Sequence, residues 1–218
     1  MASSAPNKLT ALQRDVLDAF FVRERGFFLT GGAALAGFHL GHRTTDDLDL
    51  FTAQDGAFER GRFVLAAVAD ALGGELQVRQ DAPGFKRVVL TRGSEGLVID
   101  LVRDISPQLH AQKLERDHIL IDSADEILAN KLTALVGRAE ERDLVDVMFL
   151  ERAGYSLESA LAAALAKDGG CTPATIAWLL SEVTIPDGIS LPAGVTPAEL
   201  RAYVSALTAR LLTLAAPA

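Results

Sequence analysis

The segment Asp47-Leu48-Asp49-Leu50 alternates acidic and apolar residues, and this alternation constrains the fold more than any other feature of the chain. In an extended strand, successive side chains point to opposite faces of a sheet. Leu48 and Leu50 would therefore enter a hydrophobic core, while Asp47 and Asp49 would share the other face at a separation of about 6–7 Å. Carboxylates held in this way repel each other unless a cation lies between them. The pattern predicts a sheet with one packed face and an acidic site on the other.

The acidic pair suits a hard divalent cation. Mg²⁺ or Mn²⁺ prefers oxygen ligands, usually takes one or two protein carboxylates, and leaves its other positions to water and substrate phosphates. Asp47 and Asp49 are therefore candidate metal ligands. The alternative is an ordinary solvated strand face, which an Asp-x-Asp sequence often forms.

Two glycines, Gly31 and Gly32, close the apolar run Phe27–Thr30 ahead of that strand. Because glycine has no Cβ, a turn between a strand and a helix beginning near Ala33 can bring its backbone N–H groups close to phosphate oxygens at a positive helix end. The alternative is a plain turn, for which Gly-Gly is common. The order strand, glycine turn, helix and acidic strand is the layout that a site for a metal and a nucleotide needs.

Asp100 is the acid within the apolar run Leu97–Val102, which predicts a buried strand with a carboxylate at its centre. Burial of an unpaired carboxylate is unfavourable, so Asp100 needs a cation, hydrogen bonds or access to water. If this strand lies beside that of Asp47 and Asp49, the three acids would bind one or two metal ions. Two ions about 3.5–4 Å apart stabilise the attacking and leaving oxygens of a phosphoryl displacement. The alternative is an ion pair at a strand edge with one of three basic residues, namely Arg87, Arg92 or Arg103.

A cationic stripe is expected between Leu128 and Asp146, provided that this segment forms one continuous helix. The stripe would carry Lys131, Leu135, Arg138 and Arg142. Lys131 and Arg138 would contact a triphosphate or neutralise charge as pyrophosphate leaves. Asp143 and Asp146, one turn apart, would orient Arg142 and Lys131 or contact a nucleotide.

The alternative for this segment is a solvated helix in which Arg142 and Asp146 form an i,i+4 ion pair worth about 0.2–0.5 kcal/mol. Gly137 also weakens the assumption of continuity, because glycine costs about 1 kcal/mol in a helix interior. A break at Gly137 would remove the common face of the stripe.

The periodicity of the chain predicts an α+β protein, in which a mixed sheet flanked by helices precedes a helical bundle. Helices are expected at 9–22, 31–40, 57–72, 124–136, 140–152, 157–166, 173–182 and 197–214. Besides the two strands around the glycine turn, strands are expected at 75–79, 85–90 and 97–102. We assign the sheet domain to residues 1–110 and the helical domain to residues 111–218, with the boundary within 106–123.

The 218 residues carry a formal net charge of −8, which excludes a broadly basic nucleic-acid binder. RNA would have to be held by a local patch drawn from six basic residues: Lys86, Arg87, Arg103, Lys131, Arg138 and Arg142. The single Cys171 excludes an intrachain disulfide and favours a reducing cytoplasm. We expect no signal peptide and no membrane association, because no apolar run approaches the roughly 18 residues of a membrane span.

The motifs resemble a known superfamily. Gly31-Gly32, Asp47-Leu48-Asp49-Leu50 and Asp100 are similar to the signature of the DNA polymerase β-type nucleotidyltransferases, in which a Gly-Gly or Gly-Ser turn precedes an acidic strand. A closer similarity, to the nucleotidyltransferase toxins of the AbiEii/AbiGii and MenT type, rests on Arg43, Thr45 and the segment 128–146. That segment is similar to the family pattern Lys-x-x-Ala-Leu, Arg, Arg-Asp-x-x-Asp. The matching motifs run from about Phe27 to Leu150.

Gly32 departs from the many superfamily members that have serine at the second position of the turn. A serine hydroxyl can contact a phosphate, whereas Gly32 offers only its backbone N–H. The nucleotide preference is therefore harder to predict.

The resemblance implies a nucleotidyltransferase catalytic core in residues 1–110 and a helical domain that contributes motif residues in 111–218. It implies Asp47, Asp49 and Asp100 as metal ligands and, with Lys131, as catalytic residues. It further implies a nucleotide-binding set of eight residues: Gly31, Gly32, Arg43, Thr45, Arg138, Arg142, Asp143 and Asp146.

The resemblance also implies an activity. The chain would transfer a nucleoside monophosphate from an NTP to an acceptor and release pyrophosphate, with Mg²⁺ or Mn²⁺ as cofactor. The favoured acceptor is RNA, at the 3′ end of tRNA, in a cytoplasmic toxin paired with a cognate antitoxin. Two alternatives stay open: transfer to a small molecule of the aminoglycoside type or to a protein, and an inactive nucleotide-binding or interaction protein that keeps the fold.

Overall fold

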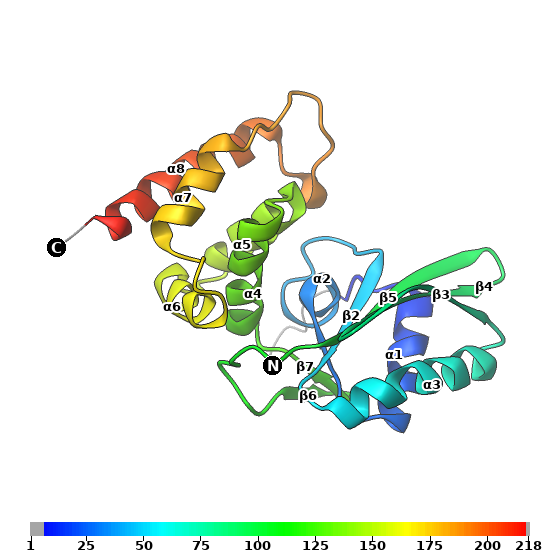
Figure 1. Cartoon of the computed structure of the whole chain (residues 1–218). Coiled ribbons are helices and arrows are strands. Elements are labelled where there is room, and N and C mark those ends of the chain that lie inside the picture. Colours follow the sequence, from blue (N-terminus) through cyan, green and yellow to red (C-terminus); the bar gives the residue numbers. More distant parts are fainter. Residues whose placement is uncertain (1–6, 217–218) are drawn as a thin grey trace, which may run out of the picture. The chain divides into compact units, whose positions relative to one another are not determined.

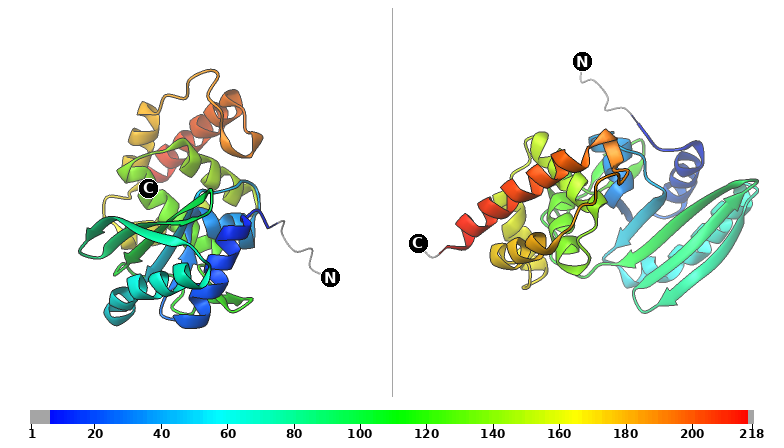
Figure 2. Two further views of the ribbon diagram at one scale, coloured as in Figure 1. Left: turned by 90° about the vertical axis from the view of Figure 1, so that its right-hand side faces the viewer. Right: turned by 90° about the horizontal axis from the view of Figure 1, so that it is seen from above.

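The computed structural model describes residues 7–216 of the chain. It forms two compact units, each drawn in Figures 1 and 2. The sheet unit comprises the chain up to Ser106 together with His110–Ser123. The helical unit comprises Pro107–Leu109 and the chain from Ala124 onward.

Within the described residues, the sheet unit contains a seven-stranded sheet in the order β3-β4-β5-β2-β1-β7-β6. Its strands are β1 (Phe28–Thr30), β2 (Asp47–Thr52), β3 (Glu75–Ala82), β4 (Phe85–Arg92), β5 (Glu95–Arg103), β6 (Leu114–Arg116) and β7 (Ile119–Ile121). β2 pairs with β5, and β1 with β7, in parallel, and the other pairings are antiparallel. The mixed sheet and the helices that follow confirm the α+β class.

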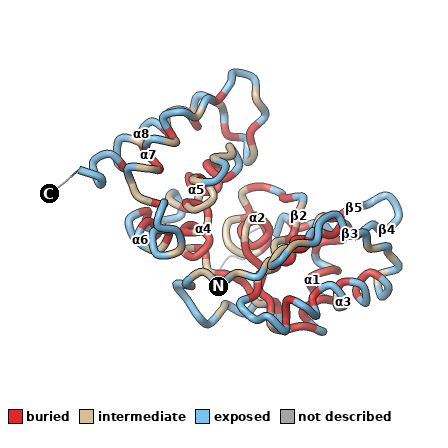
Figure 3. Tube along the Cα trace, in the orientation of Figure 1, coloured by how far each residue is buried: buried red, intermediate tan, exposed pale blue. Residues whose placement is uncertain are grey.

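One face of the sheet is packed against α1 (Ala11–Arg23) and α3 (Asp55–Ala71), which lie together in Figure 1. Leu48 and Leu50 of β2 are fully buried, as are Ile99 and Leu101 of β5. In Figure 3 the buried stretches of α1 and α3 are drawn in red. Asp47 and Asp49 alternate with these leucines and are only partly buried. The period of two therefore divides the sheet into a packed face and an acidic face, as the sequence predicts.

The segment after β1 begins as α2 (Gly31–Ala34) and continues as a π-helical turn over Leu35–His39. The helix expected at 31–40 is thus present, with its second half wound more loosely than an α-helix. α1 begins with a capping box, in which Thr10 and Gln13 exchange side-chain to backbone hydrogen bonds.

β6 and β7 are strands that the sequence pattern did not indicate. Each has three residues, too few to show a clear period of two. They extend the sheet unit to Ser123, beyond residue 110 and within the 106–123 segment that was expected to hold the boundary.

The helical unit contains α4 (Ala124–Gly137), α5 (Glu141–Arg152), α6 (Leu157–Lys167), α7 (Pro173–Glu182) and α8 (Pro197–Ala215). Hydroxyl side chains cap the last three helices: Ser156, Thr172 and Thr196. In the part of the chain that the structure describes, no helix is long and apolar enough to cross a membrane.

The expected helices at 124–136 and 140–152 are two separate helices, so the condition for the cationic stripe, one continuous helix over 128–146, is not met. α4 ends at Gly137, and α5 starts at Glu141 after Ala139 adopts a left-handed backbone with φ of 42°. The break at Gly137 changes the direction of the chain, so residues before and after it no longer share one helical face.

Candidate active site

A row of polar side chains crosses four neighbouring strands on the acidic face of the sheet. Arg87 of β4 pairs in register with Asp100 of β5, Asp100 with Asp49 of β2, and Asp49 with Thr30 of β1. Residues that pair across neighbouring strands point to the same face. Asp47, two residues before Asp49, shares that face. The structure therefore places the three acids that the sequence indicates on one face of two neighbouring strands.

Each end of this acid cluster has a defined partner. The Thr45 hydroxyl donates to Asp47 Oδ1 at 2.6 Å. Arg87 donates from Nε to Asp100 Oδ1 at 2.8 Å and from Nη2 to Asp100 Oδ2 at 2.7 Å. The Asp100 side chain is 7% exposed, whereas the Arg87 side chain is 46% exposed. Asp100 therefore forms the ion pair with Arg87 that the alternative interpretation names, and it does so beside Asp49.

All three acids raise the pKa of the Arg87 guanidinium. Its pKa is raised above the ordinary value, first by the hydrogen bond and charge of Asp100 and then by the charges of Asp47 and Asp49. Arg87 is thus the cation that the repulsion between these carboxylates requires in the metal-free protein.

The donor set fits a hard divalent metal ion, since carboxylate oxygens are the ligands that Mg²⁺ and Mn²⁺ prefer. Across residues 7–216, however, no three or more His, Cys, Asp or Glu side chains lie close enough together to hold a metal ion as they stand. Arg87 binds both oxygens of Asp100, and Thr45 binds an oxygen of Asp47, so at least two of the three acids already have hydrogen-bond donors.

The glycine turn lies directly against the acids. Gly31 has a φ of 63°, and a Cβ at this position would lie 2.2 Å from Asp49 Oδ2. Only glycine allows both this left-handed backbone and such a close approach. The turn and the Asp49 carboxylate are therefore in direct contact.

The serine-to-glycine departure at Gly32 has a structural reason. A Cβ on Gly32 would lie 2.9 Å from Arg43 Nη2 and 3.0 Å from Thr45 Oγ1. Arg43 and Thr45 are both buried and occupy the space that a serine side chain would need. The two residues that the sequence indicates ahead of the acidic strand therefore pack on the turn.

Sequence reasoning missed a buried network at the end of β1. Asp122 follows β7, is fully buried, and accepts from the Thr30 hydroxyl at 2.8 Å and from Lys113 Nζ at 2.5 Å. His39 Nε2 lies 2.8 Å from the Asp122 carbonyl oxygen. Because Thr30 immediately precedes Gly31, the network fixes the strand end from which the glycine turn starts. The signal in the sequence was an acid directly after the apolar run Ile119–Ile121.

Lys131 is at the centre of a second cluster, within the helical unit. Its Nζ lies 2.6 Å from Asp143 Oδ1 and 2.8 Å from Asp146 Oδ2, and both aspartates are fully buried. Arg138 Nε lies 3.0 Å from Asp143 Oδ2. Burial lowers the pKa of Lys131, but Asp146 and Asp143 outweigh burial and raise the pKa above its ordinary value. Asp143 and Asp146, both on α5, therefore fix the direction of the Lys131 side chain.

Arg142 does not join this cluster. Its Nε lies 2.6 Å from Glu140 Oε2, and its side chain is about half exposed. Because the chain breaks at Gly137, Arg142 does not share one helical face with Lys131 of α4. Within α5, Arg142 pairs with Glu140, while Asp146 Oδ2 lies 2.8 Å from Lys131 Nζ.

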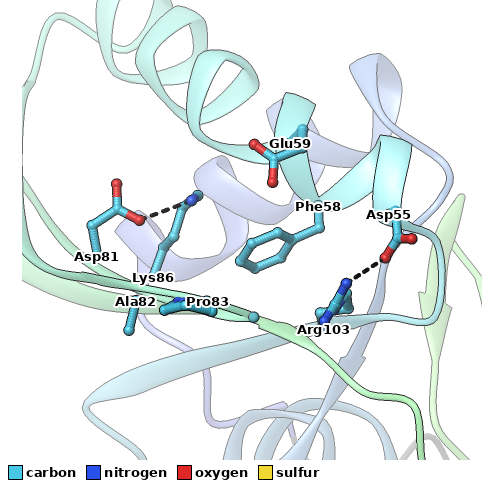
Figure 4. A pocket seen from close by; sticks show the side chains of 9 residues that line it. Asp55, Phe58, Glu59, Asp81, Ala82, Pro83, Lys86 and Arg103 are labelled. Carbon is cyan, nitrogen blue, oxygen red and sulfur yellow. Dashed lines mark hydrogen bonds and ion pairs between the residues drawn. The ribbon is translucent and has the colours of Figure 1, made fainter.

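Lys86 and Arg87 do not form a shared patch for RNA. Consecutive strand residues point to opposite faces, so Lys86 enters the packed face while Arg87 lies on the acidic face. Lys86 is 8% exposed, donates to Asp81 at 2.8 Å, and has its Nζ 4.7 Å from the centre of the Phe58 ring (Figure 4). These side chains line a cavity of about 370 Å³ whose other basic residue, Arg103, is paired with Asp55 at 2.7 Å (Figure 4).

Comparisons with known proteins point to one family. Residues 15–217 match the family described as nucleotidyl transferase AbiEii toxin, type IV toxin–antitoxin system. No curated protein matches the chain.

Solved structures show the same fold at low sequence identity. The nucleotidyltransferase toxin MenT4 from Mycobacterium tuberculosis is similar with a TM-score of 0.61 and 17% identity, over 94% of this chain and 86% of MenT4. JHP933 from Helicobacter pylori is similar with a TM-score of 0.56 and 19% identity, over 94% of this chain and 92% of JHP933.

Proposed function

The chain belongs to the nucleotidyl transferase AbiEii toxin family and is a nucleotidyltransferase, and we propose a specific reaction for it. In this reaction the protein moves a nucleoside monophosphate from an NTP to RNA and releases pyrophosphate. The observation that carries the proposal is the in-register pairing of Asp49 with Asp100, beside the glycine turn that touches Asp49. This arrangement offers carboxylates for a metal ion and backbone donors for phosphates in one place.

Asp47, Asp49 and Asp100 are the residues that would hold Mg²⁺ or Mn²⁺. When bound, the metal supplies charge neutralisation on the phosphates and activation of an acceptor hydroxyl. The Gly31-Gly32 backbone approaches the donor phosphates without Cβ hindrance, and its N–H groups donate to phosphate oxygens. Arg43, packed on Gly32, adds a fixed positive charge, and Thr45 holds the carboxylate of Asp47 by its 2.6 Å hydrogen bond.

Lys131 is the proposed contact for the donor triphosphate and for the charge that develops as pyrophosphate leaves. An ammonium has three N–H donors, and the contacts to Asp143 and Asp146 use two of them. The two aspartates keep Lys131 charged and fix its direction. Arg138, with its side chain about half exposed beside Asp143, is a second cation for the nucleotide. Asp143, Asp146 and Arg142 complete the proposed nucleotide-binding set.

The favoured acceptor is RNA, at the 3′ end of tRNA, and the favoured context is a cytoplasmic toxin with a cognate antitoxin. The family description, a toxin of a type IV toxin–antitoxin system, supports this context. The net charge of −8 means that few phosphates would be neutralised, so RNA binding should be local. Transfer to a small molecule or to a protein is the alternative that uses the same donor chemistry.

The acceptor is tested by incubating the protein with each of the four NTPs labelled on the α-phosphate, Mg²⁺, and total RNA, a small-molecule mixture or a protein fraction. We expect label in RNA, concentrated in the tRNA band. Label in the small molecules or in the protein fraction would identify that fraction as the acceptor in place of RNA. The proposed chemistry at the NTP donor would be unchanged. Label in no fraction, from a protein that binds Mn²⁺, would count against transfer itself.

A further inference from the structure

Arg87 contacts Asp100, one of the carboxylates that would hold the proposed metal ion. It pairs in register with Asp100, which pairs in register with Asp49, so guanidinium and carboxylates share one row on one face. Both of its hydrogen bonds to Asp100 are short, at 2.7 and 2.8 Å, and they engage both carboxylate oxygens. A bidentate pair of this kind is among the stronger hydrogen-bonded contacts in proteins.

A divalent cation and this guanidinium cannot both bind the two carboxylate oxygens of Asp100. They would compete for the same oxygens, and their positive charges repel each other at short range. The other two acids lie on the same face, since Asp49 pairs in register with Asp100 and Asp47 lies two residues before Asp49 on β2. The described residues contain no ready cluster of three ligands, which accords with carboxylates that are already engaged by Arg87 and Thr45.

We propose that Arg87 is the counter-ion of Asp47, Asp49 and Asp100 in the metal-free protein, and that metal binding requires Arg87 to release at least one oxygen of Asp100. Arg87 is thus a positioning residue that opposes premature metal loading. The inference rests on the proposed function, because it takes the three acids as the metal ligands.

The surroundings of Arg87 allow it to move. Its side chain is 46% exposed, while Asp100 is 7% exposed, so the guanidinium approaches the carboxylate from the solvent side. The Phe85 ring, on the same strand and the same face, has its centre 5.6 Å from Arg87 Cζ. A guanidinium that leaves Asp100 can remain over this ring, where cations are attracted to the aromatic face.

The test measures Mn²⁺ binding by calorimetry without nucleotide in the wild type, Arg87→Gln and Arg87→Lys. We expect Arg87→Gln to bind Mn²⁺ about fivefold more tightly, which corresponds to about 1 kcal/mol. Arg87→Lys should fall between the two, because a lysine keeps the charge but cannot form the bidentate pair. Arg92→Gln is the matched control: it removes the same charge from the same strand, but Arg92 pairs with Asp15 at 2.7 Å, so Mn²⁺ affinity should not change.

A second readout is thermal unfolding with and without saturating Mn²⁺. Arg87→Gln leaves Asp100 buried without its cation, so this variant should have a lower Tm than the wild type in the absence of metal and a larger gain on adding Mn²⁺. If Arg87→Gln does not fold, Arg87→Lys carries the same comparison.

The outcomes separate the two proposals. Equal or weaker Mn²⁺ binding by Arg87→Gln, in a protein whose binding is lost in Asp49→Asn, overturns the role of Arg87 and leaves the metal site standing. Absence of Mn²⁺ binding in the wild type and in the Arg87 variants overturns the metal site and the role of Arg87 together.

Discussion

Gly31→Ala is the substitution whose effect the structure specifies most fully. Gly31 has a φ of 63°, and the left-handed region costs an alanine about 1–2 kcal/mol. The new Cβ would also lie 2.2 Å from Asp49 Oδ2, whereas ordinary contacts begin near 3.4 Å. The Asp49 carboxylate must therefore shift by about 1 Å, and a displacement of that size at a reacting centre can cost about 100-fold in rate.

The chain offers a matched control. Gly93, in the turn between β4 and β5, has a φ of 61°, and a Cβ there would meet nothing within 4 Å. Gly93→Ala therefore introduces the same backbone strain without touching the acids. Gly93→Ala should lose about 1–2 kcal/mol of stability, and Gly31→Ala at least as much because of its added contact with Asp49. Each kcal/mol lowers the Tm by about 2–4 °C in a chain of this size.

The assay is transfer of label from an α-labelled NTP at saturating Mg²⁺, with thermal unfolding measured in parallel. We expect Gly31→Ala to lose about 100-fold in transfer while Gly93→Ala stays within about threefold of the wild type. Equal activity of the two variants would refute the contact between the glycine turn and Asp49 as a requirement for the chemistry.

Four other predictions concern Asp49, Lys131 and Lys86. Asp49→Asn should lose Mn²⁺ binding in calorimetry and keep its far-UV circular dichroism, and retained binding would remove Asp49 from the metal ligands. Lys131→Met removes the ammonium from between two buried carboxylates, so it should lose about 3–5 kcal/mol in denaturant unfolding, and an unchanged midpoint would contradict the buried cluster. Because the folded-state pKa of Lys131 is raised, its contribution to stability is present below the ordinary lysine value of 10.5 and lost as pH rises through the higher folded-state value. The Tm of the wild type should therefore fall above about pH 10.5 more steeply than that of Lys131→Met. Lys86→Ala should leave RNA labelling unchanged, because Lys86 faces the packed side of the sheet, and a selective loss of RNA labelling would contradict that orientation.

The sequence predicted those parts of the site that depend on the alternation of side chains between the two faces of a strand. The alternation at Asp47 and Asp49 was sufficient to assign an acidic face, because burial of Leu48 and Leu50 forces the intervening side chains to the other side. The apolar run around Asp100 likewise predicted a buried strand, and its pairing with β2 brought the third acid into place.

The same local patterns could not predict contacts between residues that are far apart in the sequence. The network of Thr30, Lys113 and Asp122 depends on the parallel pairing of β1 with β7, which no local periodicity encodes. The stripe that would include Arg142 depended on a helix that continues past Gly137, and α4 ends at that glycine, where the low helix propensity of glycine indicated a possible break.

The most direct test of nucleotidyl transfer compares one NTP labelled on the α-phosphate with the same NTP labelled on the γ-phosphate. Transfer of a nucleoside monophosphate moves the α-label into RNA and releases the γ-label as pyrophosphate. We predict this split for the wild type and for Arg92→Gln, and no incorporation for Asp49→Asn. Incorporation of the γ-label into the acceptor, or undiminished incorporation of the α-label by Asp49→Asn, would contradict transfer at the acid cluster.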